Sequence, residues 1–191
     1  MTTFKSKINT KIFIINGLPQ SGKHTFVSKI GFHERNVTYI NSNFPLVHIA
    51  DNMGIDETLG LIHIQFMLKL KILWNKYNTE AYDRFISFIE EELHVRKDYK
   101  VSSVLFLEIN NRKDINKTKL ILSTLGVKAN TILFRRDGVK YPQILSYYDL
   151  SDDYDVIVNN NKTVKDLERK ALEFRRLFLN KTSKRHGTTI F

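Results

Sequence analysis

Residues 12–26 read Ile-Phe-Ile-Ile-Asn-Gly-Leu-Pro-Gln-Ser-Gly-Lys-His-Thr-Phe, and this stretch decides the fold. The apolar segment Ile12–Ile15 is rich in β-branched residues and predicts a buried strand that enters a glycine-rich turn and then a helix. Gly17, Gly22 and Lys23 have the spacing of a phosphate-binding P-loop, the Walker A motif. The glycines let the backbone bend so that successive N–H groups converge on one anion, which the positive end of the next helix also attracts. The stretch therefore predicts a phosphate cradle.

The position after the lysine departs from this motif. A Ser or Thr hydroxyl normally holds Mg²⁺ there, whereas this chain has His24 with Thr25 behind it. Because Mg²⁺ prefers oxygen ligands, the sequence supports the phosphate site and leaves the metal geometry open. The alternative is a chance Gly-x4-Gly-Lys in a surface loop, which the strand, turn and helix context disfavours. The predicted nucleotide-binding residues of the loop are Gly17, Leu18, Pro19, Gln20, Ser21, Gly22, Lys23, His24 and Thr25.

Composition bounds the class of protein. With 191 residues, the chain is expected to form one domain over residues 1–180, followed by a basic tail at residues 181–191. Its net charge of +10 suits nucleotides or nucleic acid as ligands, although a lysine-rich solvated surface explains it equally well. The absence of cysteine excludes disulfides and thiolate metal sites. The chain shows no signal-peptide pattern, and Lys69 and Lys71 interrupt its best membrane-spanning candidate, so we expect a cytoplasmic protein.

Strands and helices alternate along the rest of the chain. Further strands are predicted at Val37–Ile40, Val101–Ile109, Thr131–Phe134 and Asp155–Val158. Helices are predicted at Leu46–Met53, Glu57–Lys76, Thr79–Val95, Asp114–Leu125 and Val164–Leu179. The helix at Glu57–Lys76, capped by Asp56, has too many apolar positions for one stripe, which predicts burial on more than one side. The alternation predicts an α/β fold with a mostly parallel sheet covered by helices on both faces.

Polar and glycine residues lie where several of the predicted strands end. Gly17, Glu108, Arg135 and Asn159 each occupy the last position of a strand or the position just after it. Ligands of parallel sheets bind beyond the carboxyl ends of the strands. These four positions are therefore expected to converge on one site.

Taken together, these segments resemble the P-loop nucleotide kinases. The closest likeness is to the phage-type deoxynucleoside monophosphate kinases, with adenylate kinase and dephospho-coenzyme A kinase as wider relatives. Besides the P-loop, the segment Tyr154–Leu167 is similar to the family pattern Asp-x-Val-Ile-x-Asn-x-Gly-Thr-x-x-Asp-Leu. Three further segments match family segments in the right order: Asn43–Ala50, Phe106–Glu108 and Thr131–Arg136. In the first of them, an Asp and a Lys of the family are replaced by Phe44 and Val47, and two residues after Glu108 an Arg of the family is replaced by Asn110.

The resemblance implies a three-layer P-loop NTPase-like fold and ATP-dependent phosphoryl transfer. The implied acceptor is a (deoxy)nucleoside monophosphate or a similar small phosphate, and the implied cofactors are ATP and Mg²⁺. Lys23 is assigned to the outer phosphates of ATP, and Arg135 and Arg136 are assigned to the transferring phosphoryl group. Glu108 is expected to hold Mg²⁺ through water or to accept the acceptor's proton. Asn159 lies in a turn that packs near the nucleotide base in the relatives.

Other functions stay open on the sequence. His24 and the replaced family residues favour a degenerate nucleotide-binding protein without turnover. The basic surface and tail favour a nucleic-acid-binding protein, although no known motif of that class is visible. Single residues also have structural alternatives, since Glu108 fits a solvated strand-end carboxylate and Asp137 fits a partner for Arg135 or Arg136. The acceptor, the base preference and the oligomeric state are not determined by the sequence.

Overall fold

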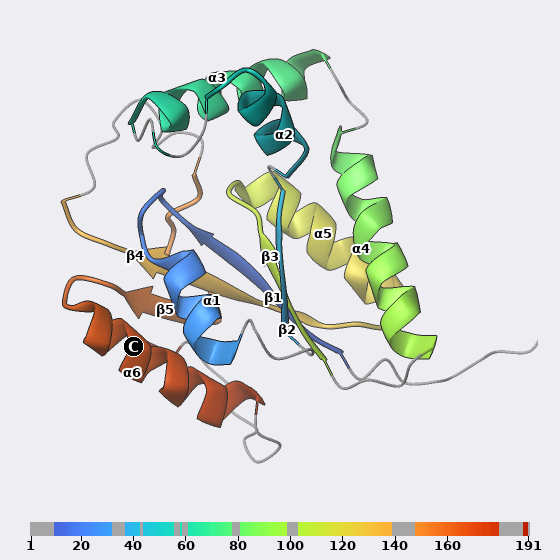
Figure 1. The fold of residues 1–191 in the computed structure, drawn as a ribbon. Coiled ribbons are helices and arrows are strands. Elements are labelled where there is room, and N and C mark those ends of the chain that lie inside the picture. Colours follow the sequence, from blue (N-terminus) through green and yellow to red (C-terminus); the bar gives the residue numbers. More distant parts are fainter. Residues whose placement is uncertain are drawn as a thin grey trace, which may run out of the picture.

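The computed structural model describes residues 10–31, 37–42, 44–55, 58, 61–77, 81–98, 103–138, 148–179 and 189–190 (Figure 1). The predicted cap at Asp56 lies outside these ranges, as do residues 180–188, which hold most of the predicted basic tail. Within the described ranges the chain forms one sheet with helices packed on both faces (Figure 1).

A six-stranded sheet forms the middle layer, with the strand order β2-β3-β1-β4-β5-β6. Its strands are β1 (Thr10–Gly17), β2 (Val37–Asn41), β3 (Ser103–Glu108), β4 (Ala129–Arg135), β5 (Val156–Asn159) and β6 (Thr189–Ile190). Every pairing between neighbouring strands is parallel. The predicted parallel sheet is thus confirmed, and the short edge strand β6 is an addition that the sequence pattern does not predict.

The helices divide between the two faces and one end of the sheet. They are α1 (Lys23–Gly31), α2 (Phe44–Asn52), α3 (Leu61–Tyr77), α4 (Ala81–Asp98), α5 (Arg112–Thr124) and α6 (Val164–Phe174), which continues as the π-helical turn η3 (Arg175–Leu179). Figure 1 shows α1 and α6 on one face, α4 and α5 on the other, and α2 and α3 beyond the end of the sheet where β2 and β3 finish. The predicted three-layer arrangement is confirmed.

Strand alternation divides the core into two clusters, one on each face of the sheet. Ile12 and Ile14 of β1 belong to the cluster under α4 and α5, whereas Phe13 and Ile15 belong to the cluster under α1 and α6. In the second cluster the ring of Phe13 packs edge-on against that of Phe174 at a centroid distance of 5.0 Å. The central strand is therefore buried on both faces, which explains its continuous apolar run.

Helix α3 does not have the environment that its composition predicts. Ile62, Ile72 and Leu73 are all at least half exposed, with relative exposures of 63%, 50% and 53%. The prediction that this helix is buried on more than one side is wrong. The physical reason is its position: it packs beside α2 beyond the end of the sheet, and none of the described elements forms a second layer over its outer side.

Side-chain caps set where two helices begin. The side chain of Asn111 accepts a hydrogen bond from the backbone N–H of Asp114 at 2.8 Å, so α5 starts at Arg112, two residues before its predicted start. Thr163 caps α6 in the same way. These caps fix the first turns of both helices relative to the strand ends that precede them.

Candidate nucleotide-binding site

The loop from Gly17 to Lys23 joins β1 to α1 in a conformation that requires its glycines. Gly17 and Gly22 have φ angles of +147° and +97°, and Gln20 also has a positive φ of +62°. A Cβ atom on Gly17 would lie 2.6 Å from the carbonyl oxygen of Phe134, closer than real Cβ contacts come. Both motif glycines are thus required by backbone conformation, and Gly17 is also required by close packing of the loop on β4.

One polar side chain of this loop is buried without a partner. Ser21 is 1% exposed, and its hydroxyl oxygen has no hydrogen-bond partner among the described residues. The helix α1 begins two residues later, and its first turn is closed by a 2.9 Å bond from the N–H of Phe26 to the carbonyl oxygen of Gly22. A buried hydroxyl beside a helix N-terminus fits an anionic oxygen as its missing partner.

Lys23 lies over the loop rather than pointing into solvent. Its ammonium group donates to the carbonyl oxygens of Gly17 at 2.6 Å and Leu18 at 2.9 Å. Its Nζ also lies 3.3 Å from Oε1 of Glu108, and the two side chains are only 8% and 10% exposed. The structure therefore brings together two residues that are 85 positions apart and that the sequence assigns to the same site.

Glu108 is held at both carboxylate oxygens. Oε1 faces Lys23, and Oε2 accepts a hydrogen bond from the hydroxyl of Tyr39 on the neighbouring strand β2. Burial raises the pKa of Tyr39 far above its usual range, and the adjacent Glu108 carboxylate raises it further, so the tyrosine stays a neutral donor. Sequence reasoning missed Tyr39, because nothing in its local pattern indicates which residue it faces across the sheet.

A third basic residue reaches this end of the sheet from α3. Lys71 donates to the hydroxyl of Ser42 at 3.3 Å and is 8% exposed. Burial lowers the pKa of Lys71 to about 8, although the carboxylates of Glu108 and Asp114 act in the opposite direction. The sequence uses Lys71 only as an interruption of an apolar run. A lysine within an otherwise apolar stretch of helix is the signal that could have singled it out.

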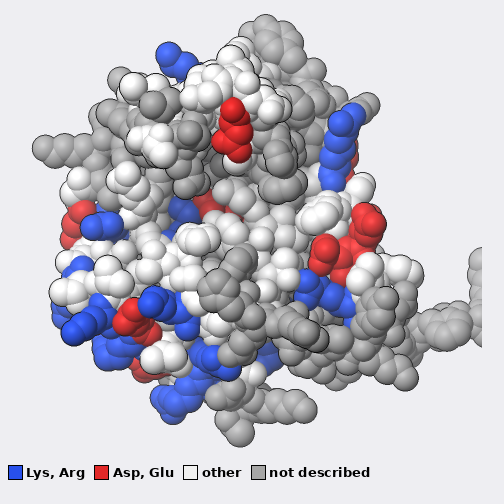
Figure 2. All heavy atoms as spheres, in the orientation of Figure 1, with Lys and Arg blue, Asp and Glu red and all other residues white. Residues whose placement is uncertain are grey.

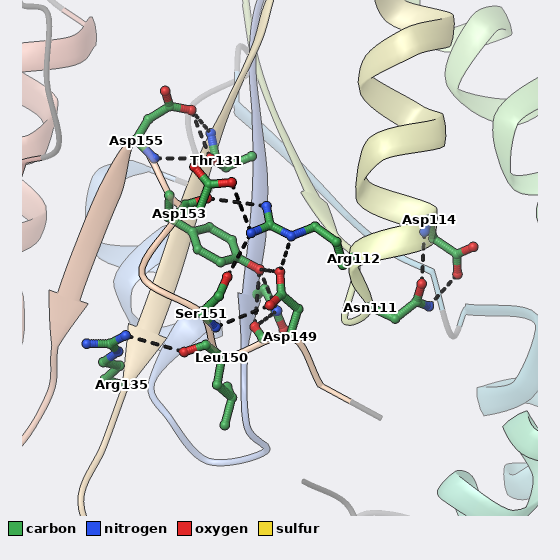
Figure 3. A network of polar contacts seen from close by, with 12 residues as sticks. Asn111, Arg112, Asp114, Thr131, Arg135, Asp149, Leu150, Ser151, Asp153 and Asp155 are labelled. Atoms are coloured by element: carbon green, nitrogen blue, oxygen red, sulfur yellow. Dashed lines mark hydrogen bonds and ion pairs between the residues drawn. The ribbon is translucent and has the colours of Figure 1, made fainter. Parts of the chain in front are cut away.

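The two predicted clamp arginines point to different partners. Arg136 donates to the carbonyl oxygen of Gln20 at 3.0 Å, which places it beside the phosphate loop. Arg135 instead pairs with Asp152. It also donates to the carbonyl oxygen of Leu150 at 3.3 Å, as Figure 3 shows. Only Arg136 is therefore next to the proposed phosphate site in this conformation.

Asp137 does not take the partner that the sequence suggests. Among the contacts of the described residues, its carboxylate accepts from the side-chain amide of Asn161 at 2.6 Å. Its backbone N–H donates to the oxygen of that same amide at 2.7 Å. The alternative in which Asp137 pairs with Arg135 or Arg136 is not seen among the described residues, where Asn161 in the turn after β5 is its partner.

The turn after β5 contacts the phosphate loop through Asn160. Its side-chain nitrogen donates to the carbonyl oxygen of Ser21 at 3.0 Å, and its backbone N–H donates to the carbonyl oxygen of Arg135 at 2.7 Å. The predicted contact residue, Asn159, offers its carbonyl oxygen to the Lys170 side chain instead. A run of consecutive asparagines does not indicate by itself which one faces the loop, so Asn159 as a base contact stays a prediction.

A polar network supports the first residue of the loop (Figure 3). The side chain of Asn16 accepts from the N–H of Gly17 at 2.6 Å and donates to the hydroxyl of Tyr154 at 2.8 Å. Arg112 at the start of α5 pairs with Asp149 at 2.8 Å, and the hydroxyl of Tyr154 donates to that carboxylate at 3.1 Å. The segment 148–155 is thus tied both to the end of β1 and to the start of α5.

The described residues limit which metals the protein could hold by itself. Among them, no group of three or more His, Asp or Glu side chains is placed to bind a metal ion. Mg²⁺ in phosphate sites commonly takes one or two carboxylates, with water and substrate phosphates as its other ligands. A single buried carboxylate at Glu108 fits that pattern, whereas His24 at the usual hydroxyl position does not.

Basic and acidic side chains both reach the floor of a hollow below α2 and α3 in the space-filling view (Figure 2).

In the parts of the chain that the structure describes, no helix is long and apolar enough to cross a membrane.

No family model matches this chain, and no curated protein matches it. Solved structures do. An unliganded sugar kinase from Janibacter sp. HTCC2649 has a TM-score of 0.50 and 12% identity, with 87% of this chain and 95% of that chain covered. An APS kinase from Mycobacterium tuberculosis, in complex with AMPPNP and APS, has a TM-score of 0.48 and 11% identity over 87% of this chain and 98% of its own. A dephospho-CoA kinase from Campylobacter jejuni has a TM-score of 0.41 and 16% identity over 88% and 97%.

The likeness to the sugar kinase shows the fold alone, since the sequence identity is low. The chain has the three-layer α/β fold of the P-loop NTPases, and the predicted fold class is confirmed. A special closeness to phage-type deoxynucleoside monophosphate kinases stays a prediction.

Proposed function

We propose that this chain is a P-loop kinase that transfers the γ-phosphoryl group of ATP to a (deoxy)nucleoside monophosphate or a similar small phosphate acceptor. The observation that carries the proposal is the buried pair of Lys23 and Glu108, which faces the phosphate loop at the carboxyl end of the parallel sheet. Phosphoryl transfer depends mainly on positioning and charge neutralisation, and this pair sits where both are needed.

The proposed roles follow from where each group lies. The backbone N–H groups of the loop and the Ser21 hydroxyl would bind the β-phosphate, and Lys23 would exchange its carbonyl contacts for the outer phosphates. Arg136 would contact the transferring group from the edge of the loop. Glu108 would hold Mg²⁺, directly or through water, or accept the acceptor's proton. Bound Mg²⁺ would neutralise charge on the phosphates.

In the proposed transfer, an oxygen of the acceptor forms a bond to the γ-phosphorus of ATP. The bond between the γ-phosphorus and the β–γ bridging oxygen breaks at the same time, and ADP leaves. The protein makes no covalent bond in this scheme. A buried site that excludes water would favour transfer to the acceptor over hydrolysis of ATP.

The test is incubation of the full chain with ATP, Mg²⁺ and a panel of nucleoside and deoxynucleoside monophosphates, read as diphosphate formation by chromatography. Lys23→Met should abolish transfer, because the outer phosphates lose their buried cation. The matched control is Lys29→Met on the same helix, where the lysine is half exposed and pairs with Glu168, and transfer should persist. Diphosphate formed equally well by Lys23→Met would remove the proposed site.

A second function has one specific observation in its favour. His24, in the position of the Mg²⁺-binding hydroxyl, is exposed and packs edge-on against the ring of Tyr39 at 5.8 Å. This arrangement suits a protein that binds nucleotide without turning it over. ATP binding by calorimetry without ADP production would support that alternative. His24→Ser should then raise Mg²⁺-dependent transfer if the missing hydroxyl is what limits it.

The nucleic-acid alternative has weaker support. Figure 2 shows Lys and Arg side chains gathered over α1 and α6, with acidic groups among them. Within that surface, Lys29 pairs with Glu168, and Arg169 pairs with Asp166 and Glu173. The surface is therefore mixed in charge. Salt-sensitive retention of DNA or RNA that survives Lys23→Met would be needed to favour it.

A further inference from the structure

The peptide that joins Ser21 to Gly22 is held from outside the phosphate loop. The side-chain nitrogen of Asn160 donates to the carbonyl oxygen of Ser21 at 3.0 Å, and Asn160 is only 8% exposed. The same nitrogen lies so close to Gly22 that a Cβ atom there would approach it to 2.4 Å. On the other side of Ser21, its backbone N–H donates to the carbonyl oxygen of Leu18 at 3.1 Å. The orientation of the peptide after Ser21 therefore depends on a residue of the turn after β5.

This peptide has two orientations that the chain can accommodate. In a trans peptide the carbonyl oxygen and the N–H point in opposite directions. Turning the peptide over changes mainly ψ of Ser21 and φ of Gly22, and glycine accepts φ values of either sign. Gly22 has a φ of +97°, and the described contacts give its N–H no acceptor. By binding the carbonyl oxygen, Asn160 selects the orientation in which this N–H points away from the turn.

The turn that carries Asn160 is itself fixed on two sides. The backbone N–H of Asn160 donates to the carbonyl oxygen of Arg135 at the end of β4, at 2.7 Å. The buried ammonium group of Lys170 on α6 donates to the carbonyl oxygen of Asn159 at 2.5 Å and pairs with Asp166 at 2.8 Å. Because the donor sits on a fixed turn, the loop has its orientation before a ligand arrives.

We propose that Asn160 is a positioning residue of the phosphate site: it holds the carbonyl oxygen of Ser21 so that the N–H of Gly22 faces the β-phosphate of the nucleotide. The inference rests on the proposed function, because it takes the loop as the site of the outer phosphates of ATP. An N–H turned toward an anion attracts it, whereas a carbonyl oxygen in the same place repels it. One side chain outside the loop thus decides which of the two groups the ligand meets.

The direct test observes this one peptide in the full-length protein. Ser21 and Gly22 form the one Ser-Gly pair of the chain. Cell-free synthesis with serine labelled by carbon-13 at the carbonyl carbon and glycine labelled by nitrogen-15 therefore gives a single carbon-coupled amide signal. Inorganic pyrophosphate is the probe. Its binding should move the Gly22 amide proton downfield and slow its exchange with solvent, because the N–H then donates to an anionic oxygen.

Asn160→Leu removes the donor and nearly keeps the size of the side chain, and Asn160→Ala is the second variant if the first does not fold. An unchanged Gly126 signal shows that the fold is intact. The Ser21–Gly22 signal of the free variant should be shifted or doubled, because the peptide is no longer held in one orientation. Pyrophosphate affinity, measured by calorimetry, should fall about tenfold or more, which corresponds to a binding orientation populated at most about one tenth of the time. At saturation the signal should reach its wild-type bound position.

The matched control is Asn161→Leu in the same turn. Asn161 is exposed, and its side chain contacts Asp137 rather than the loop. Its replacement should leave pyrophosphate affinity within about twofold of the wild type.

The results separate this inference from the proposed function. A pyrophosphate-dependent shift of Gly22 and a loss of affinity in the Asn160 variant, without diphosphate formation from ATP and monophosphates, would support the positioning role and count against the kinase. A wild-type Gly22 amide that ignores pyrophosphate would overturn the positioning role even in an active kinase. A folded Asn160 variant that binds pyrophosphate as tightly as the wild type would overturn it as well. So would an equal loss in Asn161→Leu, because the effect would then belong to the whole turn.

Discussion

Replacing Lys71 by methionine should stabilise the protein at neutral pH. The ammonium group is buried, and burial lowers its pKa from 10.5 to about 8. A pKa that is lower in the folded state means that the folded protein disfavours the charged form, by about 3 kcal/mol at pH values below both pKa values. Methionine keeps the length of the side chain without the charge. Removing the charge therefore stabilises the folded protein, and the lost hydrogen bond to Ser42 offsets about 1 kcal/mol of that stabilisation.

The expected net gain is about 2 kcal/mol, or about 4–8 °C in melting temperature for a chain of this size. The sign of its pH dependence also follows. The penalty in the wild type is complete below the folded pKa of about 8 and disappears as pH rises towards 10.5, so the advantage of Lys71→Met should shrink over that window. Urea denaturation of both proteins at about pH 7 and about pH 10 measures the difference.

The control is Lys69→Met on the same helix, where the side chain is exposed and the change should stay within about 0.5 kcal/mol at both pH values. A Lys71→Met protein that is less stable than the wild type by the same amount at both pH values would refute the reasoning. The lysine would then act through packing, and its charge would carry no penalty.

Two further substitutions test the loop and its surroundings. Gly22→Ala should cost about 2 kcal/mol of stability and most of the ATP affinity, because the new Cβ would lie 2.4 Å from the side-chain nitrogen of Asn160 at a φ of +97°. The control is Gly54→Ala, where φ is +72° and a new Cβ would have no atom within 4 Å. This change should cost about 1 kcal/mol of stability, measured by denaturation, and leave ATP binding, measured by calorimetry, unchanged. An equal loss of ATP binding in both variants would count against the packing argument. Arg136→Met should lower the transfer rate about tenfold or more, and by a larger factor than Arg135→Met, because only Arg136 contacts the loop; the reverse order would show that the Asp152 pair of Arg135 opens during turnover.

The strand segments that the sequence predicts are nearly those that form. The run Ile12–Ile15 lies inside β1, and its residues alternate between the two cores of the sheet. The prediction succeeds there because a buried central strand must be apolar on both faces, and few other structures need such a run. The loop that follows is predictable for a related reason, since positive φ angles at Gly17 and Gly22 restrict which residues can stand there.

The positions of the site residues are harder to read from the sequence. Glu108 is recognisable as a carboxylate at a strand end, but its partners Lys23 and Tyr39 come from separate segments. Arg135 and Arg136 are adjacent in the chain and reach different partners, because neighbouring residues at the end of a strand point in opposite directions. The two residues have the same side chain, so the sequence alone does not indicate which of them contacts the loop.

The sequence by itself determined the parallel α/β fold and the loop that can bind phosphate, because both depend on local residue types and on their periodicity along the chain. Only the tertiary structure decided that Asn160 supports that loop, that Asn16 anchors its first residue, and that Lys71 comes to rest beside Ser42. Those contacts join residues that are far apart in the chain or equivalent in type. These contacts depend on the register of the strands and on the position of α3 beyond the end of the sheet. No short stretch of sequence specifies either of these features.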